Sequence, residues 1–398
     1  MGRSRRAAVA GRLGLAVLAL ALAVPTAVVT DLRNQVTEID VDDLVDAPSN
    51  ADGQADEPGD PNAGEPLNIL IIGSDSRQGE GNHVDDETSV LADTHIVAHV
   101  AADRSRAELV SVPRDTMVEI PDCRTTSGDV IPARFGMFNS AFAYAWQAGQ
   151  DHESAVACDI NLVQHLTGLT LDGFVLVEMG GFVDMVDALG GIDICIPEPI
   201  DAPKAQLTLD AGQQVLDGTD ALGYARARVG VGDGTDPERI ERQQHLMSAF
   251  VDDVLSHNVL FDAPELYGMA QAALRSLSVS PSLNSLPDLA GLGFAMQGLR
   301  SEDVTFVTTP TEPYPLDTNR LQWTDETDEI WQRLRADEPL AGEAEDEAAT
   351  DYSPEDPTGD SSDEEPEAEE TAGEETTPEE TPADDGFGDS AKDLNTAC

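Results

Sequence analysis

Hydrophobic residues follow two different patterns along the central part of this chain. Continuous apolar runs of strand length predict β-strands over residues 67–72, 94–101, 107–112, 174–177, 192–196 and 304–307. Apolar residues at spacings of three and four predict helices over residues 138–147, 154–166, 182–189, 219–224, 237–255, 264–277 and 286–299. Because strands and helices interleave, we expect an α/β (α+β) domain over residues 67–336, with a mixed central β-sheet flanked by helices.

The first 30 residues carry the pattern of an export signal. Residues 1–12 contain four arginines, and residues 13–30 form an apolar run at the lower limit of length for a membrane-spanning helix. Basic residues before the run and Asp31 after it orient the start toward the cytoplasm and the body toward the outside. We therefore predict a cytoplasmic basic N-terminus (1–12) and a single-pass transmembrane signal anchor (13–30) in the cell membrane. A cleaved signal peptide is the alternative, and it too would export the body.

Acidic segments flank the predicted domain. Residues 31–66 are rich in Asp, Pro, Gly and Asn, which predicts a flexible stalk. Residues 337–398 hold 24 acidic residues and a single basic one, Lys392, so we expect a disordered tail. The formal net charge of -55 disfavours nucleic acid as a partner, because its phosphates would be repelled.

The four cysteines are Cys123, Cys158, Cys195 and Cys398, and no two of them form a CxxC pair. A metal ribbon or a thioredoxin-like motif is therefore disfavoured. Four cysteines allow three pairings, among which we favour a Cys123–Cys158 disulfide in an oxidising compartment. Buried unpaired thiols are the alternative.

Arginines near the ends of predicted elements are the most informative polar residues. Arg226 and Arg228 alternate, so both would face one way in an extended segment. Guanidinium groups bind phosphate oxygens in pairs and keep their charge, so arginines from separate segments predict a polyanionic ligand. Salt bridges on an acidic protein are the alternative. The candidate residues are Arg77, Arg114, Arg226, Arg228, and the predicted helix's Arg239, Arg242 and Gln243.

Two aspartates are the best candidates for metal ligands. Asp75 follows one apolar strand and Asp93 precedes another, so their carboxylates could meet at an edge of the sheet. Two carboxylates completed by substrate phosphates and water suit Mg²⁺, with Mn²⁺ as the alternative ion. Each aspartate could instead cap a loop. His95 and His99 share a strand face, where we expect ordinary packing or solvent exposure rather than metal binding.

The chain has no Gly-x-Ser-x-Gly elbow and no Walker loop, which disfavours a serine hydrolase or an NTPase. It closely resembles the LytR-CpsA-Psr family in six blocks that occur in the family's order. These blocks are residues 68–77 (NILIIGSDSR), 92–94 (ADT), 111–115 (SVPRD), 182–193 (FVDMVDALGGID), 216–228 (LDGTDALGYARAR) and 236–244 (DPERIERQQ).

The resemblance implies a LytR-CpsA-Psr-like catalytic domain held outside the membrane, acting on two partners. The first is a polyprenyl-pyrophosphate-linked glycopolymer of teichoic acid, capsule or arabinogalactan type, and the second is peptidoglycan, which receives the polymer. By position, Asp75 and Asp93 would hold Mg²⁺. The residues implied to grip the pyrophosphate are Arg114, Arg226, Arg228, Arg239 and Gln243, with Asp236 nearby.

Two features depart from the family pattern. Many relatives carry a basic residue just before the second aspartate motif, where this chain has Leu91, and the loop over residues 78–90 is long and acidic. The expected activity is a Mg²⁺-dependent phosphotransferase that uses Asp75, Asp93, Arg114 and Asp236. A polyprenyl-pyrophosphate hydrolase and a non-catalytic wall-binding or regulatory protein are the alternatives.

Overall fold

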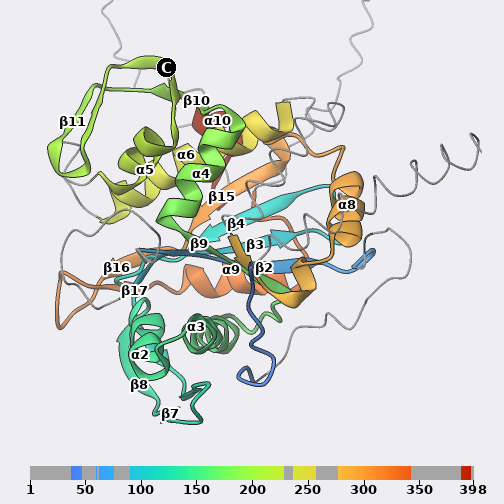
Figure 1. The fold of residues 1–398 in the computed structure, drawn as a ribbon, viewed down its shortest axis with the longest axis vertical. Helices are drawn as coiled ribbons and strands as arrows, with labels where there is room; N and C mark the ends of the chain where they lie inside the picture. The colour runs from blue at the N-terminus through green and yellow to red at the C-terminus, as the bar shows by residue number, and fades with distance from the viewer. Residues whose placement is uncertain are drawn as a thin grey trace, which may run out of the picture.

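The core of the protein is one eight-stranded sheet (Figure 1). The computed structural model describes residues 37–46, 60, 62–75, 90–227, 236–256, 277–341 and 387–395. In sheet order the strands are β1 (Thr37–Glu38), β14 (Leu277–Val279), β9 (Gly173–Glu178), β2 (Leu67–Ser74), β3 (Ala92–Val100), β4 (Ala107–Ser111), β15 (Val304–Thr308) and β18 (Asp389–Ser390). Strands β2, β3 and β4 are antiparallel neighbours, whereas β2 pairs with β9, and β4 with β15, in parallel. The predicted mixed sheet is confirmed.

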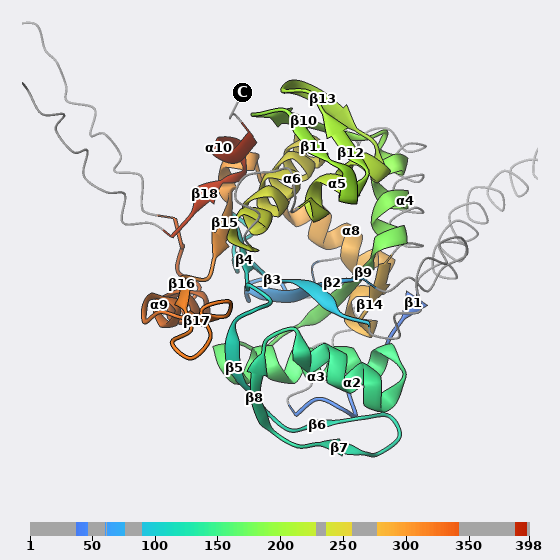
Figure 2. The ribbon, with the colours of Figure 1, turned by 90° about the vertical axis from the view of Figure 1, so that its left-hand side faces the viewer.

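Helices cover both faces of this sheet (Figure 2). On one face lie α2 (Ser140–Gly149) and α3 (His152–Thr167), and on the other lie α5 (Gly218–Arg226), α6 (Asp236–Ser256) and α8 (Leu286–Ala295), with α4 (Met179–Leu189) beside them. Local sequence fixes the ends of α3. The Asp151 side chain accepts a hydrogen bond from the Ser154 amide at 2.7 Å, and Gly168 ends the helix with a φ of 67°.

Short hairpins and helices complete the fold. The hairpins are β5 (Met117–Ile120) with β8 (Arg134–Met137), β6 (Cys123–Arg124) with β7 (Val130–Ile131), β10 (Ile192–Ile196) with β13 (Gly212–Leu216), β11 (Ile200–Ala202) with β12 (Leu207–Leu209), and β16 (Thr311–Pro313) with β17 (Leu321–Trp323). The remaining helices among the described residues are α9 (Glu326–Arg335), α10 (Ala391–Asn395) and the 3-10 turns Pro203–Ala205, Pro281–Leu283 and Ser301–Asp303. The predicted helix over residues 264–277 lies outside the described residues, except that Leu277 begins β14.

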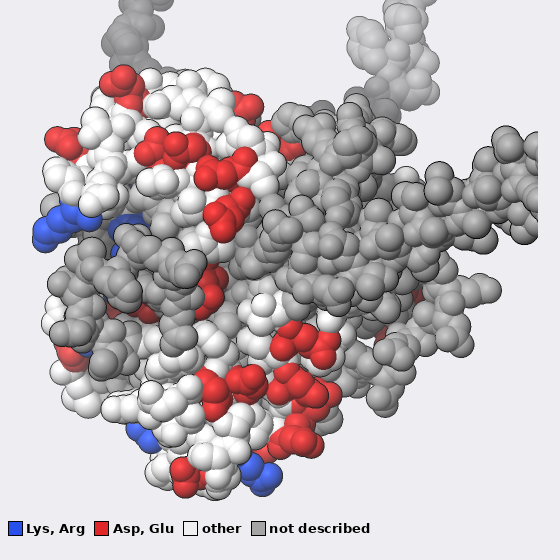
Figure 3. All heavy atoms as spheres, in the orientation of Figure 1, with Lys and Arg blue, Asp and Glu red and all other residues white. Residues whose placement is uncertain are grey.

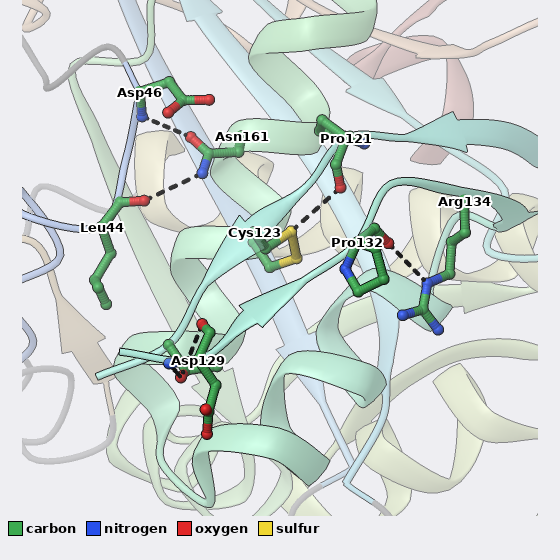
Figure 4. Close-up of a disulfide and its surroundings, with 10 residues drawn as sticks. Leu44, Asp46, Pro121, Cys123, Asp129, Pro132, Arg134 and Asn161 are labelled. Carbon is green, nitrogen blue, oxygen red and sulfur yellow. Dashed lines mark hydrogen bonds between the residues drawn. A yellow bond between two sulfur atoms is a disulfide. The ribbon is translucent and has the colours of Figure 1, made fainter. Parts of the chain in front are cut away.

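The disulfide Cys123–Cys158 is present, with a Cα–Cα distance of 5.4 Å (Figure 4). It joins the short strand β6 to the middle of α3, and both cysteines are almost fully buried. The favoured pairing is therefore confirmed. A covalent link between a surface hairpin and a core helix limits the freedom of the unfolded chain.

Part of the predicted stalk packs on the domain, so the prediction of flexibility is wrong for that part. Ile39 and Val41 are buried in the main core, because β1 adds to the sheet beside β14. The Asn161 side chain then accepts from the Asp46 amide at 2.9 Å and donates to the Leu44 carbonyl at 3.2 Å (Figure 4). The predicted anchor over residues 13–30 lies outside the described residues, in which no helix is long and apolar enough to cross a membrane.

The predicted disordered tail also has ordered ends. Residues 387–395, here called the C-terminal clasp, return to the domain and place β18 antiparallel beside β15. Ala391 is fully buried, and Lys392 lies 3.1 Å from Glu302. At the other end, Leu340 is fully buried and its carbonyl accepts from the Phe387 amide at 2.8 Å. Disorder is therefore wrong for these residues, and residues 342–386 and 396–398 lie outside the described part.

A buried polar network ties the end of α9 to the sheet. His99 contacts Asn68 at 2.7 Å and Asp337 at 3.1 Å, and Arg106 pairs with both Asp337 and Glu108. Burial raises the pKa of Glu108 to about 6, although Arg106 opposes the shift, and burial lowers the pKa of His99. The network therefore contains a carboxyl group whose ionisation opposes folding.

We expect Gly388→Val to detach the clasp. Gly388 has a φ of 142°, and a Cβ there would clash with the carbonyl oxygen of Phe306. Hydrogen exchange of β15 amides should become at least tenfold faster, since the neighbouring strand would be lost. The matched control is Gly128→Val, at a glycine that also has positive φ but faces open space. Unchanged exchange in β15 would contradict the prediction.

Glu108→Gln should change the pH dependence of stability. The raised pKa means that Glu108 favours folding below pH 4.5, and that this contribution is lost as pH rises through about 6. As pH rises from 4 to 7, the free energy of unfolding of the wild type should therefore fall by about 2 kcal/mol relative to that of the variant. Urea titrations of both proteins across this pH range measure the difference between their free energies of unfolding. Parallel pH profiles would refute it.

Candidate functional site

Two aspartates lie at the same end of the sheet because β2 and β3 are antiparallel. Asp75 directly follows β2, and Asp93 is the second residue of β3. The register pairs Ser74 with Ala92, with an irregularity between Gly73 and Ser74. Asp75 accepts from the Leu91 amide at 2.7 Å through its side chain, so it also fixes the backbone at the start of β3. Asp75 thus caps the loop that leads into β3, and it does so at the position where it would also bind a metal ion.

Arg114 reaches the same end of the sheet from β4. Its guanidinium forms a close ion pair with the Asp93 carboxylate, and its Nε lies 3.7 Å from Asp115. The amide of Asn139 donates to the Arg114 carbonyl at 3.2 Å, which fixes the backbone after the strand. Because β3 lies between β2 and β4, its start is next to the ends of both neighbours.

Helix α6 supplies the other wall of a pocket at this end of the sheet. Asp93 and Arg114 line it together with Arg239 and Gln243, and its floor includes Met247 and Phe306. Arg239 is 3% exposed, so its charge sits in a largely desolvated place. On the described face in Figure 3, acidic side chains are widespread and basic ones few. The pocket thus brings two arginines together on a chain whose formal net charge is -55.

The other candidate residues are not all brought to this pocket. Arg242 turns away and donates to the carbonyl of Ala227 at 2.5 Å. Arg226 is exposed in the last turn of α5, so the prediction of an extended segment there is wrong, because the helix continues to Arg226. Arg77 and Arg228 lie outside the described residues. Asp236 begins α6, three residues before Arg239, and its side chain is outside the described part.

One pocket residue that sequence reasoning missed is Gln244. It lines the pocket and donates to the Thr308 hydroxyl at 2.9 Å, which links α6 to β15. The signal was present in the spacing, because Ile240, Gln244 and Met247 repeat at four and three residues and share one face of α6. A helical pattern with polar residues inside an otherwise apolar face indicates a site rather than plain core.

The histidines of β3 are packed in the core, as expected. The His95 ring contacts Phe138 edge-on, and its Nε2 lies 2.9 Å from the buried Asp159, whose pKa is raised by burial. Among the described residues, His, Cys, Asp and Glu side chains nowhere gather in threes as a metal site. Asp75, after β2, and Asp93, in β3, are the carboxylates that would hold a divalent ion. That set fits Mg²⁺, which takes one or two protein carboxylates and completes its shell with substrate oxygens and water.

Comparison with known proteins relates the chain to one family. A model described as "LytR_cpsA_psr family" matches residues 27–336. The "Cell wall biosynthesis protein LcpA" of Corynebacterium glutamicum is 33% identical over 61% of this chain and 49% of its own length. The "Polyisoprenyl-teichoic acid--peptidoglycan teichoic acid transferase TagU" of Enterococcus faecalis is 28% identical over 51% of this chain and 58% of its own. The chain thus spans about half the length of these curated relatives.

Solved structures share the fold. A "LytR-Csp2A-Psr enzyme from Actinomyces oris" has a TM-score of 0.51 at 19% identity, covering 75% of this chain and 96% of that one. The crystal structure of TagV from B. subtilis has a TM-score of 0.52 at 21% identity, covering 69% and 97%. At these identities the likeness concerns the arrangement of strands and helices.

From the ion pair between Arg114 and Asp93 we predict that removal of the Asp93 charge strengthens anion binding. Without a divalent ion, the Asp93 carboxylate competes with any phosphate for the Arg114 guanidinium. Asp93→Asn should therefore bind inorganic pyrophosphate several-fold more tightly than wild type in the presence of a chelator, measured by isothermal titration calorimetry. Asp201→Asn, at an exposed position on β11, is the control. Equal or weaker binding by Asp93→Asn would show that Arg114 does not receive the anion.

Proposed function

The chain belongs to the LytR-CpsA-Psr family, and from this premise we propose that it is an extracytoplasmic phosphotransferase. It would move a polyprenyl-pyrophosphate-linked glycopolymer onto peptidoglycan and release polyprenyl phosphate. The observation that carries this proposal is the pocket in which Asp93, Arg114, Arg239 and Gln243 converge beside an apolar floor. A pyrophosphate joined to a hydrocarbon chain needs both kinds of surface next to each other.

The apolar part continues from the pocket between the sheet and the helices of the same face. Phe306, in the pocket floor, belongs to a hydrophobic cluster against which the partly buried side chains of Met247, Val251, Leu292 and Met296 pack. Long, unbranched methionine side chains adapt to ligands of irregular shape. This face offers the polyprenyl chain an apolar surface while its pyrophosphate stays at the end of the sheet.

In the proposed reaction the protein mainly neutralises charge and aligns groups. Arg114 and Arg239 would hold the pyrophosphate oxygens and stabilise the charge on the departing polyprenyl phosphate, and Gln243 would orient it. Asp75 and Asp93 would hold Mg²⁺, which when bound adds positive charge next to those oxygens. A peptidoglycan hydroxyl attacks the sugar-linked phosphorus, forming one P–O bond as the bond to polyprenyl phosphate breaks.

The hydroxyl proton requires an acceptor. Asp115 is held by Arg320 at 2.7 Å and lies 3.7 Å from Arg114, so its carboxylate serves to position both arginines. Asp236, at the start of the helix that carries Arg239 and Gln243, is the base in our proposal. The Cys123–Cys158 disulfide supports a location outside the cytoplasm, because such bonds persist in oxidising compartments. In this proposal residues 13–30 anchor the chain in the cell membrane.

A transfer assay with full-length protein in detergent tests the proposal. It uses a polyprenyl-pyrophosphoryl saccharide, Mg²⁺ and peptidoglycan fragments, and it follows saccharide linked to glycan. Arg114→Ala and Asp75→Ala should each lower the rate at least a hundredfold. The first removes a positive charge that stabilises the transition state, and the second removes a carboxylate that would hold Mg²⁺. Arg300→Ala is the matched control, since the Arg300 side chain is 76% exposed and, within the described part of the chain, pairs with its near neighbour Glu302.

The outcomes separate the alternatives. Release of free polyprenyl phosphate without linked saccharide would show that the protein is a hydrolase and not a transferase. Carrier binding without Mg²⁺-dependent turnover would favour a binding or regulatory protein. A full rate in Arg114→Ala would refute the site.

A further inference from the structure

Two hairpins near the pocket present apolar side chains to solvent. Phe135 on β8 is 53% exposed, and Leu316, in the turn between β16 and β17, is 85% exposed. The ring of Tyr314 lies against Phe135, with centroids 5.9 Å apart and planes tilted by 42°. Phe135, Tyr314 and Leu316 are here called the aromatic ledge. The exposure of Phe135 and Leu316 costs solvation free energy without a folding benefit, which suggests a surface that binds another molecule.

The ledge is fixed to the residue next to Arg114. The Tyr314 amide donates to the Arg320 carbonyl at 2.8 Å, and the Arg320 guanidinium pairs with the Asp115 carboxylate at 2.7 Å. The Leu321 amide donates to the Asp115 carbonyl at 3.2 Å. Figure 2 shows β5 running from the sheet toward β8, with β16 and β17 alongside. Through Asp115 the ledge is thus joined to the segment that carries Arg114, one of the residues that line the pocket.

The polar groups around the ledge narrow the class of ligand. Glu119 faces Phe135 across the β5–β8 pair, and Glu312 accepts from the Gln322 side chain at 2.6 Å across the β16–β17 hairpin. With Asp317, which lies 3.9 Å from Arg320, these three carboxylates outnumber the guanidinium groups of Arg320 and Arg134 and would repel a polyanion such as the donor's phosphates. Aromatic faces and planar polar side chains together suit the C–H faces and hydroxyl groups of an uncharged sugar.

We propose that the aromatic ledge binds the acceptor glycan strand of peptidoglycan and presents its hydroxyl to the pocket. This assignment rests on the proposed function, because it takes the acceptor to be a sugar chain. The arrangement separates the two substrates. The anionic carrier lies between the sheet and α6, and the acceptor approaches over the two hairpins. Phe135 and Tyr314 are then positioning residues for the acceptor and do not contact the reacting phosphorus.

The test compares Phe135→Ala and the double variant Phe135→Ala/Tyr314→Ala with Phe294→Ala in the full-length chain. Phe294 is a matched control, being 71% exposed on α8. In the transfer assay, the ledge variants should raise the KM for peptidoglycan fragments about tenfold. They should leave kcat at saturating acceptor, and the KM for the carrier, unchanged. An unchanged acceptor KM, or an equal rise in Phe294→Ala, would overturn the proposal.

A second measurement is independent of transfer. Soluble peptidoglycan glycan fragments, without carrier or Mg²⁺, should bind wild type and Phe294→Ala equally and bind the ledge variants about tenfold more weakly. If the fragments bind in this way but the wild type shows no transfer, the proposed transferase function is refuted while the assignment of the ledge as a glycan-binding surface stands. If the fragments do not bind to wild type, the proposal that the ledge binds glycan is overturned, even when the enzyme is active. Loss of a dimer in Phe135→Ala, seen by sedimentation, would instead assign the ledge to contact between two copies.

Discussion

The position of β3 between two antiparallel neighbours is the constraint on which the site depends. The start of β3 must lie where β2 ends and where β4 will later end, so the β2–β3 connection and the segment after β4 are forced into one place. Asp75 and Arg114 belong to these two segments and Asp93 to the start of β3, so no long-range coincidence is needed to bring them to the same end of the sheet. The parallel strands β9 and β15 on either side extend the sheet and bring helices to its faces.

The polar and apolar halves of the pocket come from different physical sources. The sheet end contributes backbone-fixed charges, with Asp75 bound to the Leu91 amide and Arg114 bound to Asp93. Helix α6 contributes one face on which Arg239 and Gln243 are followed by Met247. Arg239 is nearly excluded from water, so its interaction with an anion would be weakly screened by salt. The site thus combines a rigid anion-binding end with an adaptable apolar side.

Features encoded by local pattern were predictable, and features that depend on distant partners were not. The apolar runs that became β2, β3 and β4 place Asp75, Asp93 and Arg114 at their ends. Arg226 was misjudged although a local signal existed, because Asp217 caps α5 at the Asp220 amide and the helix then continues through Arg226. No local pattern shows that Ile39 is core or that Tyr314 meets Phe135, since both contacts join segments far apart in sequence.

The contact between Leu340 and Phe387 has a consequence for the edge of the sheet. The Phe387 amide donates to the Leu340 carbonyl at 2.8 Å, and two residues later β18 begins to pair with β15. Strand β15 therefore lies between β4 and β18, and its backbone groups around Thr305 and Phe306 are not left at an open edge. Unpaired strand edges are templates for pairing with another chain, so the clasp protects this side of the sheet from self-association.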